Sequence, residues 1–250
     1  MIASTFEPPT SVDRVAIEQM SARVLACPEI RLDEREEIFR IEALGLEWDL
    51  GVQLYRPKDE RLAARDAEGR RIGIFLLHGG EGDFKSMEPM ARLYAGRFGH
   101  TVVSMTYPGR LYLEDERRDW PGDTVNPDGS VRTPIWLRGE RITRDQYEVI
   151  SDTSMRLRYG TRIIARALPG SRFHERMAAW PIAFEEGMRQ AMQRFLPPPE
   201  YAIYGSGHST GGPLVFMICQ RVPNFAGVLA AEHSPFGVIQ RRQQDWSGSL

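Results

Sequence analysis

Short runs of consecutive apolar residues recur along the chain, and most of them end in glycine or another turn-forming residue. The runs of strand length cover residues 72–77, 101–105, 201–204 and 227–231. Segments with apolar residues at helical spacing lie between them, over residues 87–98, 182–196 and 214–219. Buried strands that alternate with helices are typical of βαβ units. The pattern therefore predicts an α/β fold with a mostly parallel sheet flanked by helices.

Two further patterns precede the first buried strand. Residues 11–27 have the spacing of a helix that Ser11 caps and Pro28 ends, and we expect it to pack on the main body. Its apolar stripe comprises Ile17, Met20, Val24 and Cys27. Residues 46–56 alternate between apolar and polar side chains, which predicts one or two antiparallel strands at a sheet edge.

The region 110–180 lacks a strand pattern and interrupts the alternation. It contains a charged cluster and several turn signals, followed by a predicted helix over residues 143–168 that Pro169 ends. An insertion of this length after a sheet strand predicts a cap or lid, and the alternative is an insertion remote from any site. The expected domains are a helical extension (1–43), a core (44–109 and 181–250) and the cap (110–180).

Composition and charge exclude several classes of protein. With 250 residues, of which 42% are hydrophobic, the chain can form one large or two small globular domains. A net charge of -2 gives no reason to expect a nucleic acid or an anionic membrane as partner. Cys27 and Cys219 form no disulfide framework or metal-ligand pattern, and the sequence contains no H-E-x-x-H motif. We therefore expect neither a metal nor a cofactor.

The N-terminal residues 1–9 have neither the basic segment nor the apolar segment of a secretory signal. No window reaches the ~18 apolar residues of a transmembrane helix. The resulting expectation is a cytoplasmic protein without a membrane span.

The strongest chemical signal lies in the turn that follows the strand at 201–204. Gly207-His208-Ser209-Thr210-Gly211 fits the G-x-S-x-G nucleophile elbow, between an apolar strand and an apolar helix as the motif requires. A serine becomes a useful nucleophile when a strained turn holds it out of the sheet, beside a base and near a helix N-terminus. Side chains at positions 207 and 211 would then collide with the neighbouring strand and helix. The alternative is a glycine-rich turn without chemistry.

A second glycine-rich loop, His78-Gly79-Gly80-Glu81-Gly82, follows the strand at 72–77. The order strand, His-Gly-Gly loop, helix, strand, insertion, helix, strand, elbow, helix, strand resembles the α/β-hydrolase superfamily of serine esterases and lipases. The resemblance covers residues 44–235, and the insertion matches only in position.

The resemblance implies that Ser209 is the nucleophile and that two backbone N–H groups form an oxyanion hole. One donor is Thr210, and the other comes from Gly79, Gly80 or Glu81. Glu81 departs from the His-Gly-Gly-Gly form of the family, so the choice among these three stays open.

Histidines and carboxylates complete the implied site. The triad of this family runs serine, acid, histidine along the chain. After Ser209 the sequence offers Glu232 as the candidate acid and His233, the only downstream histidine, as the candidate base, although family histidines follow a later strand. We expect His78 to shape the oxyanion loop and His208 to pack beneath the elbow. The plainest interpretation is that C-terminal strands are missing, and that further sequence or a second chain completes the triad.

The implied activity is hydrolysis of a carboxylic-ester-like bond in a small molecule, through an acyl-enzyme on Ser209. Aromatic residues of the insertion (Tyr112, Trp120 and Trp136) favour an apolar or aromatic substrate group. Amide, thioester and carbon–carbon substrates stay open, because the same elbow serves all of them.

Two functions of other classes also fit parts of the sequence. One is a hydrolase-like binding module without catalysis, because the triad is unfinished. The other is a dinucleotide-binding βαβ unit that uses Gly205, Gly207 and Glu232, although Thr210 replaces the third glycine of that fingerprint.

Overall fold

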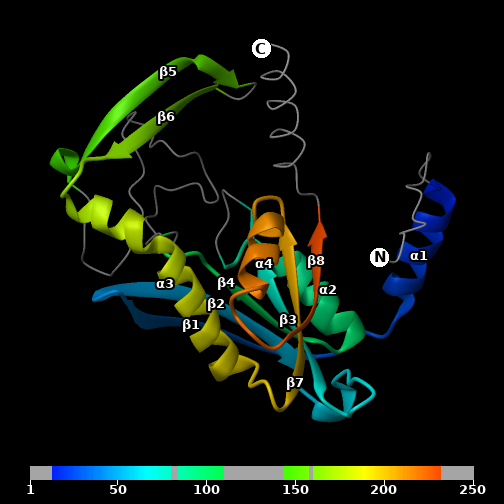
Figure 1. Ribbon diagram of the computed structural model, residues 1–250. Helices are drawn as coiled ribbons and strands as arrows, with labels where there is room; N and C mark the ends of the chain where they lie inside the picture. Colours follow the sequence, from blue (N-terminus) through cyan, green and yellow to red (C-terminus); the bar gives the residue numbers. More distant parts are fainter. Residues whose placement is uncertain (1–12, 80–83, 110–142, 158–159, 232–250) are drawn as a thin grey trace, which may run out of the picture.

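The computed structural model describes residues 13–79, 84–109, 143–157 and 160–231 (Figure 1). Within these residues six strands form the main sheet, in the order β1-β2-β4-β3-β7-β8. Their bounds are β1 Leu32–Ala43, β2 Leu46–Pro57, β3 Arg71–Leu77, β4 Thr101–Met105, β7 Tyr201–His208 and β8 Phe225–Ala231. The last four are parallel neighbours, whereas β1 and β2 continue the sheet as an antiparallel hairpin. The predicted α/β sheet is confirmed.

Helices cover both faces of this sheet (Figure 1). Helix α2 (Glu88–Phe98) packs on one face over β2 and β4, where Ala91 and Ala95 belong to a buried cluster with Tyr55 and Val102. Helices α3 (Arg172–Phe195) and α4 (Gly211–Cys219) pack on the other. The larger core on that second face includes Trp48, Leu50, Phe75, Met105, Met188 and Ile203, all of which are fully or almost fully buried. Sheet and helices together form an α/β fold in which helices pack on both faces of a mixed sheet.

The first strand corrects the predicted helical extension of residues 1–43. β1 pairs with β2 along its whole length, through a two-residue turn in which Leu44 and Gly45 have φ of 54° and 71°. Two consecutive left-handed residues are what a tight hairpin requires. Most of β1 is charged (LDEREEIFRIEA), so the pattern alone did not indicate a strand. Pairing with β2 and burial of Phe39 and Ile41 decide its conformation.

Helix α1 (Arg14–Ala26) confirms the helix predicted over residues 11–27, but its expected packing is wrong. The side chain of Asp13 caps it by accepting a hydrogen bond from Ala16 N–H at 3.0 Å, while Ser11 lies outside the described residues. None of its side chains is buried, and Ile17 and Met20 of the predicted stripe are 51% and 63% exposed. Among the described residues, the helix therefore stands beside the sheet rather than in its core (Figure 1).

The helix predicted over residues 143–168 is wrong, because most of the described residues of this segment form two antiparallel strands. Strands β5 (Tyr147–Leu157) and β6 (Gly160–Ala167) pair antiparallel as a separate two-stranded sheet, with Ile150 opposite Ile164. Val149, Ile150, Thr161, Ile163 and Ile164 are β-branched residues, which favour a strand in a paired context. Residues 110–142 of the predicted cap lie outside the described residues.

Helix α3 begins earlier than the predicted residue 182, so the boundary at residue 181 between cap and core falls inside one helix. Ser171 caps its N-terminus by accepting a hydrogen bond from His174 N–H at 3.2 Å. Pro181 lies within the helix and removes one backbone donor, but the helix continues to Phe195. Burial of Ala179, Phe184 and Met188 along one face stabilises the helix across the proline.

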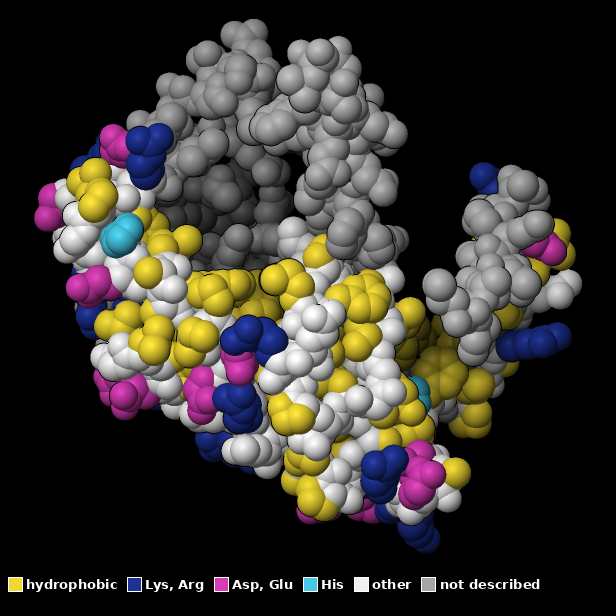
Figure 2. Space-filling view, viewed as in Figure 1, with side chains coloured by type: hydrophobic (Ala, Val, Ile, Leu, Met, Phe, Trp, Pro, Cys, Tyr) yellow, Lys and Arg dark blue, Asp and Glu magenta, His cyan; other side chains and the backbone are white. Residues whose placement is uncertain are grey.

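Helix α4 is buried on one side only within the described residues. Val215 and Ile218 are buried, whereas Phe216 and Met217 are 46% and 64% exposed. Figure 2 shows hydrophobic side chains gathered on the face that carries α3 and α4. No helix in the described part of the chain has the length and apolar character needed to cross a membrane.

Candidate active site

The turn between β7 and α4 has the backbone conformation of a nucleophile elbow. β7 ends at His208, α4 begins at Gly211, and Ser209 between them has φ of 53°. A serine in the left-handed region costs about 1–2 kcal/mol, so the surrounding structure has to hold it there. This is the strained strand–turn–helix context that the G-x-S-x-G motif requires.

Two glycines make this turn possible. A Cβ on Gly207 would lie 2.1 Å from the carbonyl oxygen of Gly211, and a Cβ on Gly211 would lie 2.6 Å from the carbonyl oxygen of Leu77. Real Cβ atoms do not approach backbone so closely, and both obstructing groups are backbone atoms that cannot move aside. The collision predicted for side chains at these two positions is confirmed.

The His-Gly-Gly loop lies directly beside the elbow. β3 and β7 are parallel neighbours with Leu77 opposite Gly207, so the residues after each strand continue side by side. A Cβ on Gly79 would lie 3.4 Å from Cβ of Ser209 and 3.8 Å from its Oγ. The carboxyl ends of neighbouring parallel strands are where α/β sheets hold their ligands. The structure therefore brings Gly79 and Ser209 into one site.

The N-terminus of α4 lies at this site as well. Thr210 occupies the N-cap position, and Gly212 N–H donates to the carbonyl of Ser209 at 3.1 Å. Thr210 is exposed and Ser209 is partly exposed. Backbone N–H groups at a helix N-terminus carry partial positive charge, which favours an anion beside them. Negative charge that develops next to Ser209 would meet this end of the helix.

His78 is completely buried beside the loop that it begins. Its Nδ1 lies 2.6 Å from the carbonyl oxygen of Gly79, and because a carbonyl only accepts, Nδ1 is the donor. His208 is half-buried, with Nδ1 3.5 Å from the position of a Cβ on Gly79. It therefore lies beside the loop. Gly80, Glu81, Glu232 and His233, the other predicted site residues, lie outside the described residues.

The sequence reasoning missed Tyr107, which follows β4 at the same end of the sheet. Its hydroxyl donates a hydrogen bond of 2.5 Å to the carbonyl oxygen of His78, and the two rings lie 4.0 Å apart between centroids. Tyr107 is 3% exposed. The available signal was an aromatic residue at the carboxyl end of a strand next to β3, followed by Pro108 and Gly109.

Within the described ranges no group of three His, Cys, Asp or Glu side chains is placed to hold a metal ion. His100 precedes β4, at the end of the parallel strands opposite Ser209, where burial lowers the pKa of its imidazole. Gly205 and Gly207 lie inside β7, and a Cβ on Gly205 would collide with Val215 at 2.6 Å. At both glycines the strand packs closely against helix α4.

No protein-family model matches this sequence, and no curated protein matches it. Solved structures with a similar fold include a bacterial heroin esterase (13% identity, TM-score 0.41, covering 87% of this chain and 50% of that one). A cold-adapted esterase from an Arctic intertidal metagenomic library is 16% identical (TM-score 0.41, 81% and 62% covered). The peroxisomal α/β-hydrolase Lpx1 of Saccharomyces cerevisiae is 11% identical (TM-score 0.40, 80% and 44% covered).

Proposed function

We propose that the chain is a serine hydrolase of the α/β-hydrolase type that cleaves a carboxylic-ester-like bond through an acyl-enzyme on Ser209. The chain spans about half of the length of the first solved proteins that it resembles. The observation that carries the proposal is the left-handed backbone of Ser209, φ 53°, in a turn between β7 and α4 beside Gly79. A non-glycine residue keeps a left-handed backbone only where the surrounding structure holds it there, and a nucleophile elbow holds its serine in this conformation to expose it.

In the proposed mechanism, Oγ of Ser209 attacks the substrate carbonyl carbon while its proton passes to a histidine. The carbonyl oxygen becomes an oxyanion that accepts hydrogen bonds from Thr210 N–H and from one backbone N–H of Gly79, Gly80 or Glu81. Collapse expels the alcohol, which takes the proton from the histidine. Water then attacks the acyl-enzyme by the same steps and releases the carboxylic acid and free Ser209.

The base and the acid are also part of the proposal. His233 and Glu232 are the candidates that this chain contributes, and a second chain or further sequence is the other source. The expectation for the acyl and alcohol groups of the substrate is based on three aromatic residues outside the described residues, Tyr112, Trp120 and Trp136. Apolar or aromatic ester groups are the first substrates to test. The names of the similar solved proteins describe those proteins and add nothing to this choice.

Covalent labelling tests the proposal most directly. The wild-type chain is incubated with a fluorophosphonate and its intact mass is measured, beside Ser209→Ala and the control Ser206→Ala. Ser206 is a buried serine of β7, three residues before Ser209, and its replacement should not change the labelling. One adduct that disappears only in Ser209→Ala supports an activated serine. A folded wild-type chain without an adduct would contradict the proposal and favour a binding module without catalysis.

A further inference from the structure

The peptide group between His78 and Gly79 is held by its carbonyl edge. The hydroxyl of Tyr107 donates to the His78 carbonyl oxygen at 2.5 Å, and the same oxygen would lie 2.7 Å from a Cβ on Gly211. The carbonyl therefore sits between a buried tyrosine and the first residue of α4. Only glycine at position 211 leaves room for it there.

This carbonyl determines where a neighbouring N–H points. The peptide group is planar and trans, so the His78 carbonyl and the Gly79 N–H lie on opposite edges of one rigid unit. Fixing the carbonyl against Tyr107 directs the Gly79 N–H away from Tyr107. A hydrogen bond to the carbonyl also polarises the peptide group and makes its N–H a stronger donor.

Tyr107 is itself held in place by helix α3. Its ring meets Phe184 edge-to-face, with centroids 5.2 Å apart and planes at 89°. Trp180 stacks on Phe184 at 5.3 Å and donates from Nε1 to the carbonyl of Pro108 at 2.8 Å. The residue after Tyr107 is thus tied to the same helix. These contacts leave the hydroxyl little freedom to leave the His78 carbonyl.

We propose that Tyr107 is a positioning residue for the oxyanion hole, which rests on the proposed function of Ser209. Its hydroxyl orients the His78–Gly79 peptide so that the Gly79 N–H is presented to the oxyanion that forms at Ser209. Of the three loop candidates for the second donor, Gly79 is the one within the described residues, and a Cβ on it would lie 3.4 Å from Cβ of Ser209. Tyr107 acts through the peptide and does not touch the substrate.

The test compares Tyr107→Phe with Tyr55→Phe. Both substitutions remove one hydroxyl from a buried tyrosine, but Tyr55 packs against α2 on the opposite face of the sheet. His78-Gly79 is the only His-Gly pair in the sequence. A sample with carbonyl-¹³C histidine and ¹⁵N glycine therefore gives a single carbonyl-to-amide NMR signal, which reports on this peptide alone.

We expect Tyr107→Phe to move or broaden the His78–Gly79 signal and Tyr55→Phe to leave it unchanged. The rate of fluorophosphonate labelling, and kcat on an ester that the wild type hydrolyses, should fall about 10-fold or more in Tyr107→Phe with little change in KM. Tyr55→Phe should keep the wild-type kcat. Unfolding in urea shows whether both variants remain folded.

Three results would overturn the inference. These are an unchanged NMR signal in Tyr107→Phe, a changed signal with wild-type kcat, or an equal loss of kcat in Tyr55→Phe. Absence of any adduct on the wild-type chain would instead contradict the proposed function of Ser209. The NMR signal would still decide whether Tyr107 holds the peptide, so the two failures are distinguishable.

Discussion

Gly79 and Ser209, which are far apart in the sequence, face each other so closely that a methyl group on Gly79 would contact Cβ of Ser209 at 3.4 Å. It would also lie 3.8 Å from Oγ of Ser209 and 3.5 Å from Nδ1 of His208. All three are ordinary van der Waals distances or slightly closer. The backbone at Gly79 therefore has room for a small side chain, which would lie beside Oγ of Ser209, where the proposed mechanism places the substrate carbonyl.

Gly79→Ala is expected to fold and to lose activity. Its methyl group fits without severe overlap, so the free energy of unfolding should change by less than about 1 kcal/mol. The rate of fluorophosphonate labelling should fall about 10-fold, because the methyl displaces the reagent from the position for attack. Gly96→Ala is the matched control, since a Cβ there meets nothing closer than 3.9 Å. Equal labelling rates in the two variants would show that the loop is not part of the site.

Gly207→Ala is expected to prevent the elbow from forming. The added methyl would lie 2.1 Å from the carbonyl oxygen of Gly211 and 2.8 Å from the nitrogen of Gly212. These are backbone atoms of the turn, so the strand and helix would have to separate. We expect a loss of about 3 kcal/mol or more in the free energy of unfolding, or an insoluble chain. Urea unfolding beside Gly96→Ala measures this, and a loss below about 1 kcal/mol would refute the packing described for the elbow.

Cys219 is expected to be unreactive in the folded protein. Burial raises the pKa of its thiol to about 12, and its Sγ would lie 3.0 Å from a Cβ on Gly205 at the interface of α4 and β7. At pH 8 roughly one molecule in 10⁴ then carries the thiolate, which is the reactive form. Iodoacetamide should therefore modify Cys219 only after unfolding in urea, as peptide mass spectrometry with Cys27→Ala would show. Rapid modification of Cys219 in the native chain would contradict the raised pKa of its partly buried thiol.

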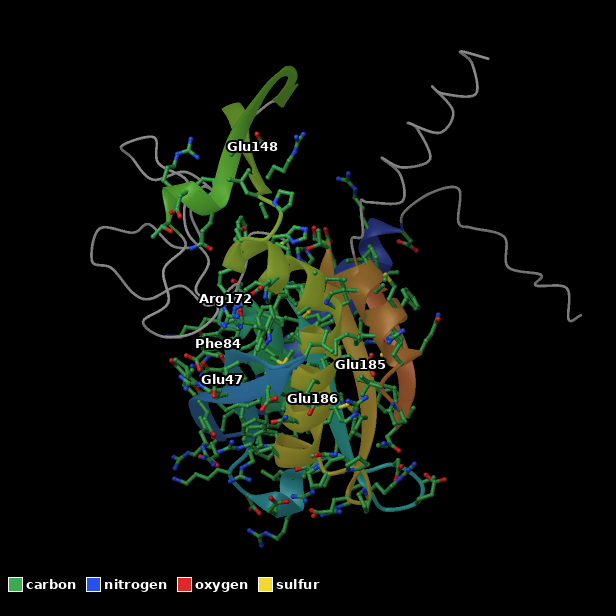
Figure 3. The ribbon with its side chains drawn as sticks, turned by 60° about the vertical axis from the view of Figure 1, so that its left-hand side comes forward. Glu47, Phe84, Glu148, Arg172, Glu185 and Glu186 are labelled. Carbon is green, nitrogen blue, oxygen red and sulfur yellow. The ribbon has the colours of Figure 1, made fainter. Side chains whose placement is uncertain are left out.

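Glu185 connects helix α3 to the turn after α4 (Figure 3). Its carboxylate accepts hydrogen bonds from Arg221 at 2.7 Å and from Arg189 at 2.8 Å. The hydrogen bond from Arg221 is the main cause that lowers the pKa of Glu185 in the folded chain. A carboxyl group with a lowered folded pKa stabilises the protein above its unfolded pKa, near 4.3, and loses this contribution as the pH falls through the folded pKa.

Glu185→Gln is therefore expected to cost about 0.5–1 kcal/mol at pH 7 and progressively less below about pH 4. Urea unfolding at pH 7 and at about pH 3 measures the difference. Glu175→Gln is a control on the same helix, because the ion pair between Glu175 and Arg172 lies within the exposed first turn. A destabilisation of Glu185→Gln that stays constant with pH would show that lost packing, not charge, is responsible.

The sequence correctly predicted the segments whose own residues strongly favour one secondary structure. The apolar run 72–77 became β3 because consecutive apolar residues are stable only where both faces of a strand are covered. The charged sequence of β1 and the β-branched residues of β5 and β6 did not give such a signal. Their conformation depends on hydrogen-bonded partners that lie elsewhere in the chain, so local propensity predicted it wrongly.

The candidate site was likewise predictable from the sequence only in part. The sequence by itself determined the elbow, because Gly207 and Gly211 are the residues that a turn with Ser209 at positive φ requires. Only the tertiary structure decided that Gly79 faces Ser209 and that Tyr107, which follows a third strand, donates a hydrogen bond to the His78 carbonyl. Parallel pairing of β4, β3 and β7 brings their carboxyl ends together, and which residues then meet depends on the strand order and register. The turn depends on residues that are adjacent in the sequence, whereas the site depends on residues that neighbouring strands of the sheet bring together.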